Sequence, residues 1–246
     1  MTPLLGYSLA VLIGISLGLL GGGGAILTVP VLVYVMGLDV KQAVPTSLVI
    51  VGLTSFTGML RHRQAGTVDV HAALTFGPAA ILGSLIGTRA ALLVSSRVQL
   101  TVFAVVLLAA ATMMLRRRRE ALHPAPTRRP LPLILLIGTG VGFLTGFVGV
   151  GGGFMYVPAL ALLAGLEMKA AVGTSLALIA LSSAAGVAGY LGQVHFDWLL
   201  VGVFTALAFV GVQIGSALVP KVPQERLRRW FAVLLLVMGV VVLVKG

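Results

Sequence analysis

The sequence lacks several of the residues on which most protein chemistry depends. It contains no cysteine, which excludes disulfides, thiol catalysis and cysteine-ligated metal. Only 6 of its 246 residues are acidic, and none are paired within an apolar segment, so neither a carboxylate proton relay nor an intramembrane aspartyl protease is visible. The four histidines fall in predicted loops or at helix ends without metal-ligand spacing: His62, His71, His123 and His195. We therefore expect no metal, no cofactor and no enzymatic activity.

Charge of either sign is scarce, and apolar residues dominate. Charged residues make up 9% of the chain and apolar residues 59%, with a mean hydropathy of +1.12, whereas roughly a quarter of a soluble domain is charged. Apolar stretches of about 17 to 23 residues recur, and a helix needs about 20 such residues to cross a bilayer. These stretches show no dyad alternation, which favours helices over a barrel. The pattern predicts an all-α integral membrane protein.

The basic residues lie mostly between the apolar stretches. The net charge of +11 arises from 17 lysines and arginines against 6 acidic residues. In these positions the positive charges orient a membrane protein by the positive-inside bias, so we do not interpret them as a nucleic-acid site. The first apolar stretch, Leu4–Leu20, has neither a basic leader nor a small-residue cleavage site, and we expect it to be retained as a helix.

The chain contains an internal duplication. Placing Pro30 on Pro158 gives an offset of 128 residues, and the alignment then runs without a gap from about Gly18 to Thr88. Chance can match apolar residues in so biased a sequence, but it does not easily match Gly, Pro, Lys, Thr-Ser and Asp at one offset. Identical pairs include Gly18 with Gly146, Gly21 with Gly149, Gly23 with Gly151, Gly24 with Gly152, Lys41 with Lys169, Thr46 with Thr174, Ser47 with Ser175, Asp69 with Asp197 and Gly87 with Gly215.

Each half is predicted to contain the same series of elements. The order is a helix, a Gly-rich break, a short apolar segment, a turn and three longer helices. In the first half these are expected near 4–20, 25–36, 43–60, 71–94 and 98–115, and in the second near 131–148, 153–164, 171–191, 198–219 and 227–244. The domains are therefore a first membrane repeat over 1–115, an Arg- and Pro-rich cytoplasmic linker over 116–130 and a second membrane repeat over 131–246.

The short segment of each half is too short to cross the membrane. About 12 residues at about 1.5 Å each span about 18 Å, against a hydrocarbon core of about 30 Å. We interpret it as half of a re-entrant hairpin, whose tip is expected at Gly37–Pro45 in the first half and at Gly165–Gly173 in the second. Irregular backbone at that depth is tolerated only when protein buries it or when it lines a watery cavity.

Three crossings plus a re-entrant hairpin would invert the second half relative to the first. If the linker is cytoplasmic, this arrangement leaves the loop 193–197, which has no Lys or Arg, outside. It also places one set of basic residues in the cytoplasm: Arg61, Arg63, Lys221, Arg226, Arg228 and Arg229. Inverted repeats with interrupted segments are typical of secondary transporters, whose substrate site lies at the midplane.

Two motif copies carry a resemblance to a known family. The second half contains Gly149–Gly153, Val157-Pro158 and Ala171–Leu176, and the first half repeats them as Gly21–Gly24, Val29-Pro30 and Ala43–Leu48. Together with the length, the duplication and the linker, these motifs resemble the signature of the TauE/SafE family of sulfite exporters over nearly the whole chain. The resemblance implies a multi-pass protein of the bacterial inner membrane that moves sulfite, sulfonates or related sulfur anions, usually outward.

One residue departs from the family pattern. Pro45 stands where the family and the second copy have glycine, at Gly173. Proline fixes the backbone φ angle, so the first tip is expected to be stiffer than the second. The two half-sites are therefore predicted to be inequivalent.

Two repeated lysines are the first candidates for binding an anion. Lys41 and Lys169 occupy equivalent positions at the predicted tips, and an in-plane pseudo-twofold axis would bring both ammonium groups toward the protein centre. In the alternative interpretation the tips reach the membrane surface and solvent surrounds the lysines. Asp39 and Glu167, two residues before each lysine, would then neutralise them or serve as a gate.

Hydroxyls, glycines and one arginine complete the candidate site. Thr46, Ser47, Thr174 and Ser175 are expected to open helices, where N–H groups and the helix dipole bind anions, although ordinary N-capping would explain them equally well. Arg89, inside an apolar stretch, would bind the anion or else snorkel to the interface. The glycines of the two breaks are expected to allow close packing and a hinge-like bend, or else to offer backbone N–H donors to the substrate pathway: Gly22, Gly23, Gly24, Gly151, Gly152 and Gly153.

The sequence therefore predicts a secondary transporter for a small anion that works by alternating access within the lipid bilayer. The resemblance to the TauE/SafE family implies that this anion is a small inorganic or organosulfur anion. A passive anion channel of the same architecture is the nearest alternative, because the same residues would suit a pore. A membrane scaffold would give no reason for polar residues duplicated at the tips. A monomer and a homodimer are both compatible with the sequence.

Overall fold

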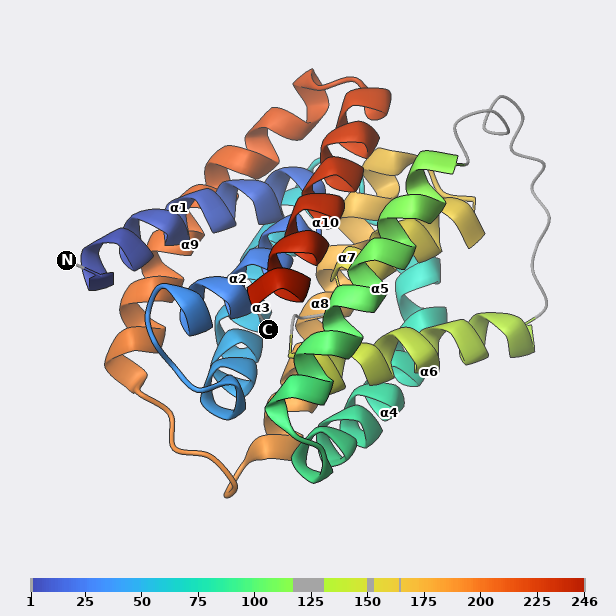
Figure 1. Ribbon diagram of the computed structural model, residues 1–246. Helices are drawn as coiled ribbons and strands as arrows, with labels where there is room; N and C mark the ends of the chain where they lie inside the picture. The colour runs from blue at the N-terminus through green and yellow to red at the C-terminus, as the bar shows by residue number, and fades with distance from the viewer. Residues whose placement is uncertain (1, 117–130, 150–152, 164, 246) are drawn as a thin grey trace.

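The computed structural model is a bundle of helices joined mostly by short turns (Figure 1) and describes residues 2–116, 131–149, 153–163 and 165–245. The first half contributes α1 (Thr2–Leu20), α2 (Gly23–Tyr34), α3 (Val40–Gln64), α4 (Val70–Leu93) and α5 (Ser96–Arg116). The second half contributes α6 (Leu131–Val148), α7 (Gly153–Pro158), the π-helical turn η1 (Ala159–Leu163), α8 (Met168–Tyr190), α9 (Trp198–Leu218), the 3-10 turn η2 (Val219–Lys221) and α10 (Gln224–Lys245). No strand occurs among the described residues, and beyond Arg116 the predicted linker lies outside them.

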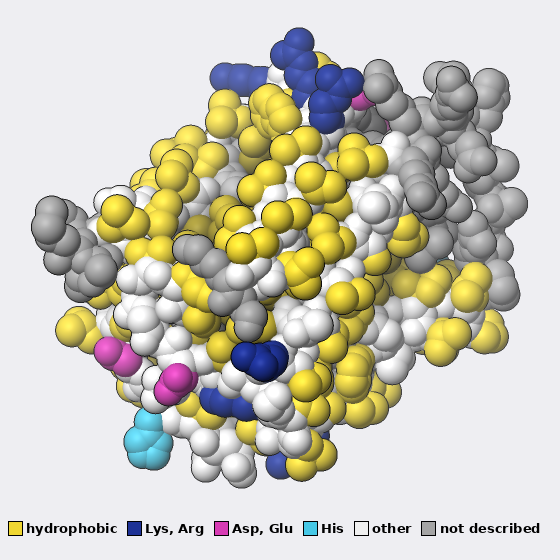
Figure 2. Space-filling model, in the orientation of Figure 1, with side chains coloured by type: hydrophobic (Ala, Val, Ile, Leu, Met, Phe, Trp, Pro, Cys, Tyr) yellow, Lys and Arg dark blue, Asp and Glu magenta, His cyan; other side chains and the backbone are white. Residues whose placement is uncertain are grey.

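Seven of these helices, α3 to α6 and α8 to α10, are long and apolar enough to cross a membrane. Large apolar side chains cover much of the outer surface (Figure 2), among them Leu74, 71% exposed, and Leu199, 77% exposed. An apolar surface of this extent is rare in soluble monomers but suits contact with lipid tails. The structure is that of an all-helical, multi-pass membrane protein.

Two aspartates of the duplication begin equivalent helices. The Asp69 carboxylate accepts a hydrogen bond of 2.9 Å from the N–H of Ala72 at the start of α4. The Asp197 carboxylate accepts bonds of 3.0 Å from the N–H groups of Leu199 and Leu200 at the start of α9. A carboxylate in this place satisfies free N–H groups and complements the helix dipole. These two acidic residues are therefore helix caps.

The two halves exchange packing partners. Helix α1 packs against α9 of the second half, and α6 packs against α4 of the first half. At the centre α3 packs against α8, while α5 and α10 lie side by side and run in opposite directions (Figure 1). The offset of 128 residues relates α1 to α6, α3 to α8, α4 to α9 and α5 to α10. The repeat therefore relates the α1/α9 contact to the α6/α4 contact, and relates the α3/α8 and α5/α10 contacts each to itself. Because each half packs its helices against the other half, the two halves are interlocked.

Glycines set the distance between the exchanged helices. A Cβ atom at any of four glycines would overlap a backbone carbonyl oxygen of the facing helix: at Gly83 that of Thr139, at Gly87 that of Phe143, at Gly211 that of Val11 and at Gly215 that of Ile15. Small residues four apart allow membrane helices to approach until their backbones touch. Gly211 and Gly215 are the repeat counterparts of Gly83 and Gly87. The α4/α6 and α1/α9 interfaces therefore have the same kind of close glycine packing.

The chain reverses sharply inside the protein at two glycines. Gly21, with φ +74°, follows α1, and Gly149, with φ +75°, follows α6, and both are buried. Residues with a Cβ atom rarely adopt this left-handed conformation. After the first reversal α2 returns along α1, where a Cβ at Gly24 would overlap the carbonyl oxygen of Ile13. With 12 residues α2 spans about 18 Å, which is less than the bilayer core.

The predicted hairpin tips at Gly37–Pro45 and Gly165–Gly173 are therefore wrong. Gly37 and Gly165 do adopt positive φ angles, +80° and +71°, but they are exposed and have open space around them. Helix α3 already begins at Val40 and contains Pro45. Membrane helices tolerate an internal proline because neighbouring groups satisfy the freed carbonyl. The buried reversals lie at the Gly-rich breaks instead.

Candidate functional site

The repeated lysines bind the ends of helices. The Lys41 ammonium group donates hydrogen bonds to the carbonyl oxygens of Ala91 and Val94, the latter at 2.6 Å, where α4 ends. The Lys169 ammonium group donates to the Pro220 carbonyl, at 3.1 Å, in η2 after α9. Figure 1 shows the α4–α5 turn and the α9–α10 turn at opposite ends of the molecule. The lysines therefore do not meet at the centre, and the predicted paired-lysine site is wrong.

This role of Lys41 leads to a prediction about stability. A cation at a helix C-terminus satisfies carbonyls and complements the dipole. We expect Lys41→Met to reduce the free energy of unfolding by about 1 to 2 kcal/mol and to leave the transport rate per folded molecule unchanged. Lys169→Met should have a smaller effect, because Lys169 makes a single, more exposed bond. Thermal unfolding in detergent and flux in liposomes measure the two quantities, and a loss of flux at unchanged stability would return Lys41 to the substrate site.

The Thr-Ser pairs lie within helices. Thr46 and Ser47 are in the second turn of α3, which begins at Val40, and Thr174 and Ser175 are in the second turn of α8, which begins at Met168. The prediction that they open helices is wrong, because the chain becomes helical six residues earlier than the first of each pair. Their backbone N–H groups are therefore not free for an anion. All four side chains are buried.

Each Thr-Ser pair instead contacts the Gly-rich break of the other half. The Ser47 hydroxyl donates to the carbonyl of Gly149 and, at 3.1 Å, to that of Val44. At the matching junction a Cβ on Gly21 would lie 2.6 Å from the Ser175 hydroxyl oxygen. The structure thus brings together the predicted serine and glycine elements, across the boundary between the halves.

The remaining candidates are distributed as follows. Gly22 precedes α2 as its N-cap residue, and Gly23 and Gly24 form its first buried turn. Gly153 begins α7, whereas Gly151 and Gly152 lie outside the described residues. Arg89 is exposed on α4, so its side chain does not enter the interior. The described glycines therefore lie next to the junctions between the halves, whereas Arg89 does not.

The two ends of the central helices differ. At Thr174 the backbone N–H of Asp69 donates a bond of 2.8 Å to the hydroxyl, and a Cβ at neighbouring Gly173 would overlap the carbonyl oxygen of Thr67. The α3–α4 loop therefore sits directly on α8. At the matching place a cavity of about 360 Å³ lies beside Thr46, and Gln42, His195, Phe196 and Asp197 help to line it. One end is closed and the other is hollow.

Two serines at the centre were not among the predicted site residues. Ser55 on α3 and Ser183 on α8 are repeat counterparts, both 0% exposed, and neither hydroxyl has a hydrogen-bond partner. They lie on the contact between the helices, since a Cβ at Gly52, one turn before Ser55, would be 3.1 Å from Ser183 Cβ. An unsatisfied buried hydroxyl is costly. The sequence signal was present, namely two hydroxyls at the repeat offset inside apolar segments.

Among the residues that the structure describes, the other buried polar side chains are hydroxyls and one amide, together with one imidazole. His62, predicted in a loop or at a helix end, is buried in the last turns of α3, and its Nε2 lies 3.2 Å from the Gly18 carbonyl oxygen. Its counterpart Tyr190 donates at 3.4 Å to the carbonyl of Gly146. Both side chains satisfy carbonyls near the buried ends of α1 and α6. No cluster of three or more His, Cys, Asp or Glu suited to a metal occurs in the described part of the chain.

The fold and this interior define a multi-pass helical membrane protein built from two interlocked repeats around a polar, uncharged centre. The profile of the family described as sulfite exporter TauE/SafE matches residues 7–242, and the chain belongs to that family. The resemblance seen in the sequence is thereby confirmed.

Several relatives cover almost the whole chain. It is 28% identical over 238 residues to a "Probable membrane transporter protein" of Xylella fastidiosa (strain 9a5c), covering 94% of this chain and 91% of that protein. It is 27% identical over 268 residues to "Probable membrane transporter protein YunE" of Bacillus subtilis (strain 168), covering 98% of each. A similar protein of Methanocaldococcus jannaschii is 26% identical over 263 residues, with 96% and 94% covered. No solved structure matches the chain significantly.

Proposed function

We propose that this protein is a secondary transporter that moves a small sulfur-containing anion, such as sulfite or a sulfonate, outward across the bacterial inner membrane by alternating access. The observation that carries the proposal is the pair of unpartnered serine hydroxyls, Ser55 and Ser183, where α3 packs against α8. One serine belongs to each repeat, so an anion between them would contact both halves. Transporters built from repeats hold their substrates at this kind of central position.

The electrostatics of the centre favour a singly charged substrate. Serine hydroxyls donate hydrogen bonds to an anion, but the buried residues that the structure describes include no Lys, Arg, Asp or Glu. Burying a charge without a counter-charge is costly, and the Born desolvation energy increases with the square of that charge. Hydrogensulfite or a sulfonate therefore fits the centre better than the dianions sulfite and sulfate.

The packing supports inverted repeats. The counterpart helices α5 and α10 run in opposite directions side by side (Figure 1), as an axis in the membrane plane requires. Arg61, near the end of α3, bonds to Gln213 on α9, which brings it toward the basic residues that follow α9. With this end in the cytoplasm, the loop 193–197 faces outside, in agreement with the positive-inside bias.

The two ends of the central helices then correspond to two gates. The bond from the Asp69 N–H to Thr174 closes the cytoplasmic end, while the cavity beside Thr46 lies at the outer end. This geometry supports an outward-facing state. In the alternate state the outer loop would close on α3 and the inner loop would leave α8, with the chain reversals at Gly21 and Gly149 as the hinges.

The proposal is tested by flux into liposomes that contain the purified protein. Labelled sulfite uptake should saturate and should accelerate when unlabelled sulfite is present on the opposite side, because a carrier exchanges its substrate. A flux that neither saturates nor exchanges would identify a passive channel. The absence of flux for sulfite, hydrogensulfite and taurine would reject the substrate class.

Substrate charge gives a second readout in the same liposomes. At constant total sulfite, lowering the pH on both sides converts the dianion to hydrogensulfite. We expect the flux to increase with the hydrogensulfite fraction, and sulfate to compete poorly at every pH. A flux that follows the dianion, or strong competition by sulfate, would contradict a centre without buried cations.

A further inference from the structure

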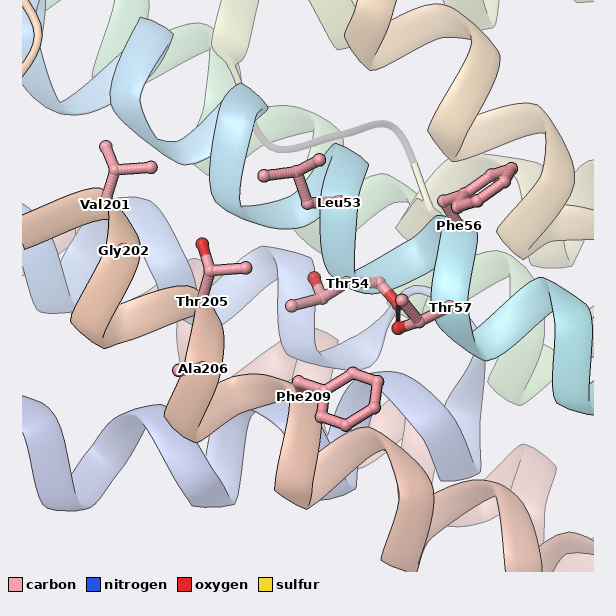
Figure 3. A pocket seen from close by; sticks show the side chains of 9 residues that line it. All are labelled: Leu53, Thr54, Phe56, Thr57, Val201, Gly202, Thr205, Ala206 and Phe209. Atoms are coloured by element: carbon pink, nitrogen blue, oxygen red, sulfur yellow. Dashed lines mark hydrogen bonds between the residues drawn. The ribbon is translucent and has the colours of Figure 1, made fainter. Parts of the chain in front are cut away.

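A groove runs along the outer surface between α3 and α9, away from the central serines. It is a cavity of about 400 Å³ with apolar walls. Leu53 and Phe56 of α3 and Phe209 of α9 contribute to these walls (Figure 3). Leu53 and Phe56 are each 51% exposed and Phe209 is 42% exposed. The side of α9 that lines the groove carries small residues, and a Cβ at Gly202 would meet no atom within 4 Å. The groove is therefore open toward the lipid.

A positive charge stands at one end of this groove. Arg61 follows Thr57 by one turn of α3, and Gln213 follows Phe209 by one turn of α9, so both continue the faces that line the groove. The Arg61 Nε donates a bond of 2.5 Å to the Gln213 side-chain oxygen. Arg61 is exposed, and a guanidinium group has further N–H donors on its terminal nitrogens. These donors suit a phosphate oxygen.

The distance from Leu53, in the groove, to Arg61, beyond its end, matches one leaflet of the bilayer. Eight residues separate Leu53 from Arg61, which corresponds to about 12 Å along α3. One leaflet contributes about 15 Å of hydrocarbon, half of the core. We propose that the groove binds one acyl chain of an anionic phospholipid whose phosphate pairs with Arg61.

The duplication provides an internal comparison. At the repeat counterparts of Arg61 and Gln213 the chain has Gly189 and Leu85. The equivalent surface, between α8 and α4, is formed by the counterpart helices but has no arginine at the position of Arg61. Further exposed basic residues, Lys221, Arg226 and Arg229, follow α9, and Lys and Arg side chains gather where α9 meets α10 (Figure 2). Of these two equivalent surfaces, the α3/α9 surface is the one that ends in Arg61, whereas the α4/α8 surface has Gly189 at that position.

Native mass spectrometry of the full-length protein with added phosphatidylglycerol or phosphatidylcholine tests the headgroup contact. We expect Arg61→Gln to weaken retention of phosphatidylglycerol by about tenfold. Retention of phosphatidylcholine should be lower in the wild type and should fall less in the variant, because the choline cation offsets the charge of the phosphate that this lipid also carries. Arg63→Gln is the matched control, since it removes the same charge from the same helix two residues away, off the groove face. Equal losses in the two variants, or equal retention of both lipids by the wild type, would overturn the proposal.

A second variant tests the acyl contact without changing charge. Gly202→Leu would place a side chain in the open groove, and we expect it to reduce phosphatidylglycerol retention as strongly as Arg61→Gln. Gly140→Leu on α6 is its control, because a Cβ there also meets no neighbour. Wild-type retention by Gly202→Leu, with the protein folded, would show that the lipid binds elsewhere.

Discussion

Replacing Gly87 by leucine is expected to prevent the protein from folding to a monodisperse state. Helix α6 approaches α4 so closely at this point that even a Cβ would overlap the carbonyl oxygen of Phe143. The obstacle is backbone rather than a flexible side chain, so the helices must separate, and the loss of packing should cost about 3 kcal/mol or more. Size-exclusion chromatography and thermal unfolding in detergent measure this loss. Gly215→Leu, at the repeat counterpart on α9, where a Cβ would overlap the Ile15 carbonyl oxygen of α1, should behave in the same way.

The control for this prediction is Gly140→Leu. Gly140 lies on α6, the helix that faces Gly87, but it is exposed and its Cβ would have open space. We expect near wild-type stability for this variant. If Gly87→Leu were as stable as Gly140→Leu, the interlocked packing of α4 with α6 would be wrong.

The second large effect is expected from the double variant Ser55→Ala/Ser183→Ala. Each hydroxyl is proposed to donate a hydrogen bond to the anion, and loss of one bond to a charged group weakens binding by about tenfold or more. The double variant should therefore lose sulfite flux by about a hundredfold at subsaturating concentration. Stability should stay the same or increase, because the substitution removes two buried hydroxyls that have no partner in the protein.

Measuring both sulfite flux and stability distinguishes a substrate-binding role of the two serines from a structural role. Thr112→Ala on α5 removes an exposed hydroxyl that bonds to Ala109 within its own helix, and should leave both readouts unchanged. A double serine variant that transports normally would remove the main support for the central site. A variant that lost flux only together with stability would indicate that the serines have a structural role.

The fold class was predictable because the signals are strong and local. Apolar stretches long enough to cross a membrane predict helices directly. Identical residues at a fixed offset, such as Asp69 and Asp197, indicate the duplication. Helix ends were harder to place. Pro45 indicated a break in the chain, yet it lies inside α3, because packing in a membrane protein supplies partners that a local pattern does not contain.

The candidate site was less predictable because its contacts join distant parts of the chain. Lys41 and Lys169 are equivalent in sequence, and a twofold relation makes it natural to bring them together. The structure gives each lysine a partner about 50 residues further along the chain, on carbonyls at the end of the fourth helix of its own half. The repeat in the sequence shows which residues of the two halves are equivalent. It does not show which equivalent pairs lie close to the pseudo-twofold axis and therefore close to each other. Ser55 and Ser183, which fulfil the same repeat criterion, lie at the central contact.

The exchange of helices between the halves also has a consequence for synthesis. When the ribosome has completed α5, helices α1 and α4 are already made, but the glycine faces that will hold α9 and α6 have no protein partner. Lipid must occupy those faces until the remaining helices are inserted, so the first half has no finished form of its own. The second half serves as the template on which the first half completes its folding, and a truncated chain ending in the linker should be recognised and degraded by membrane quality control.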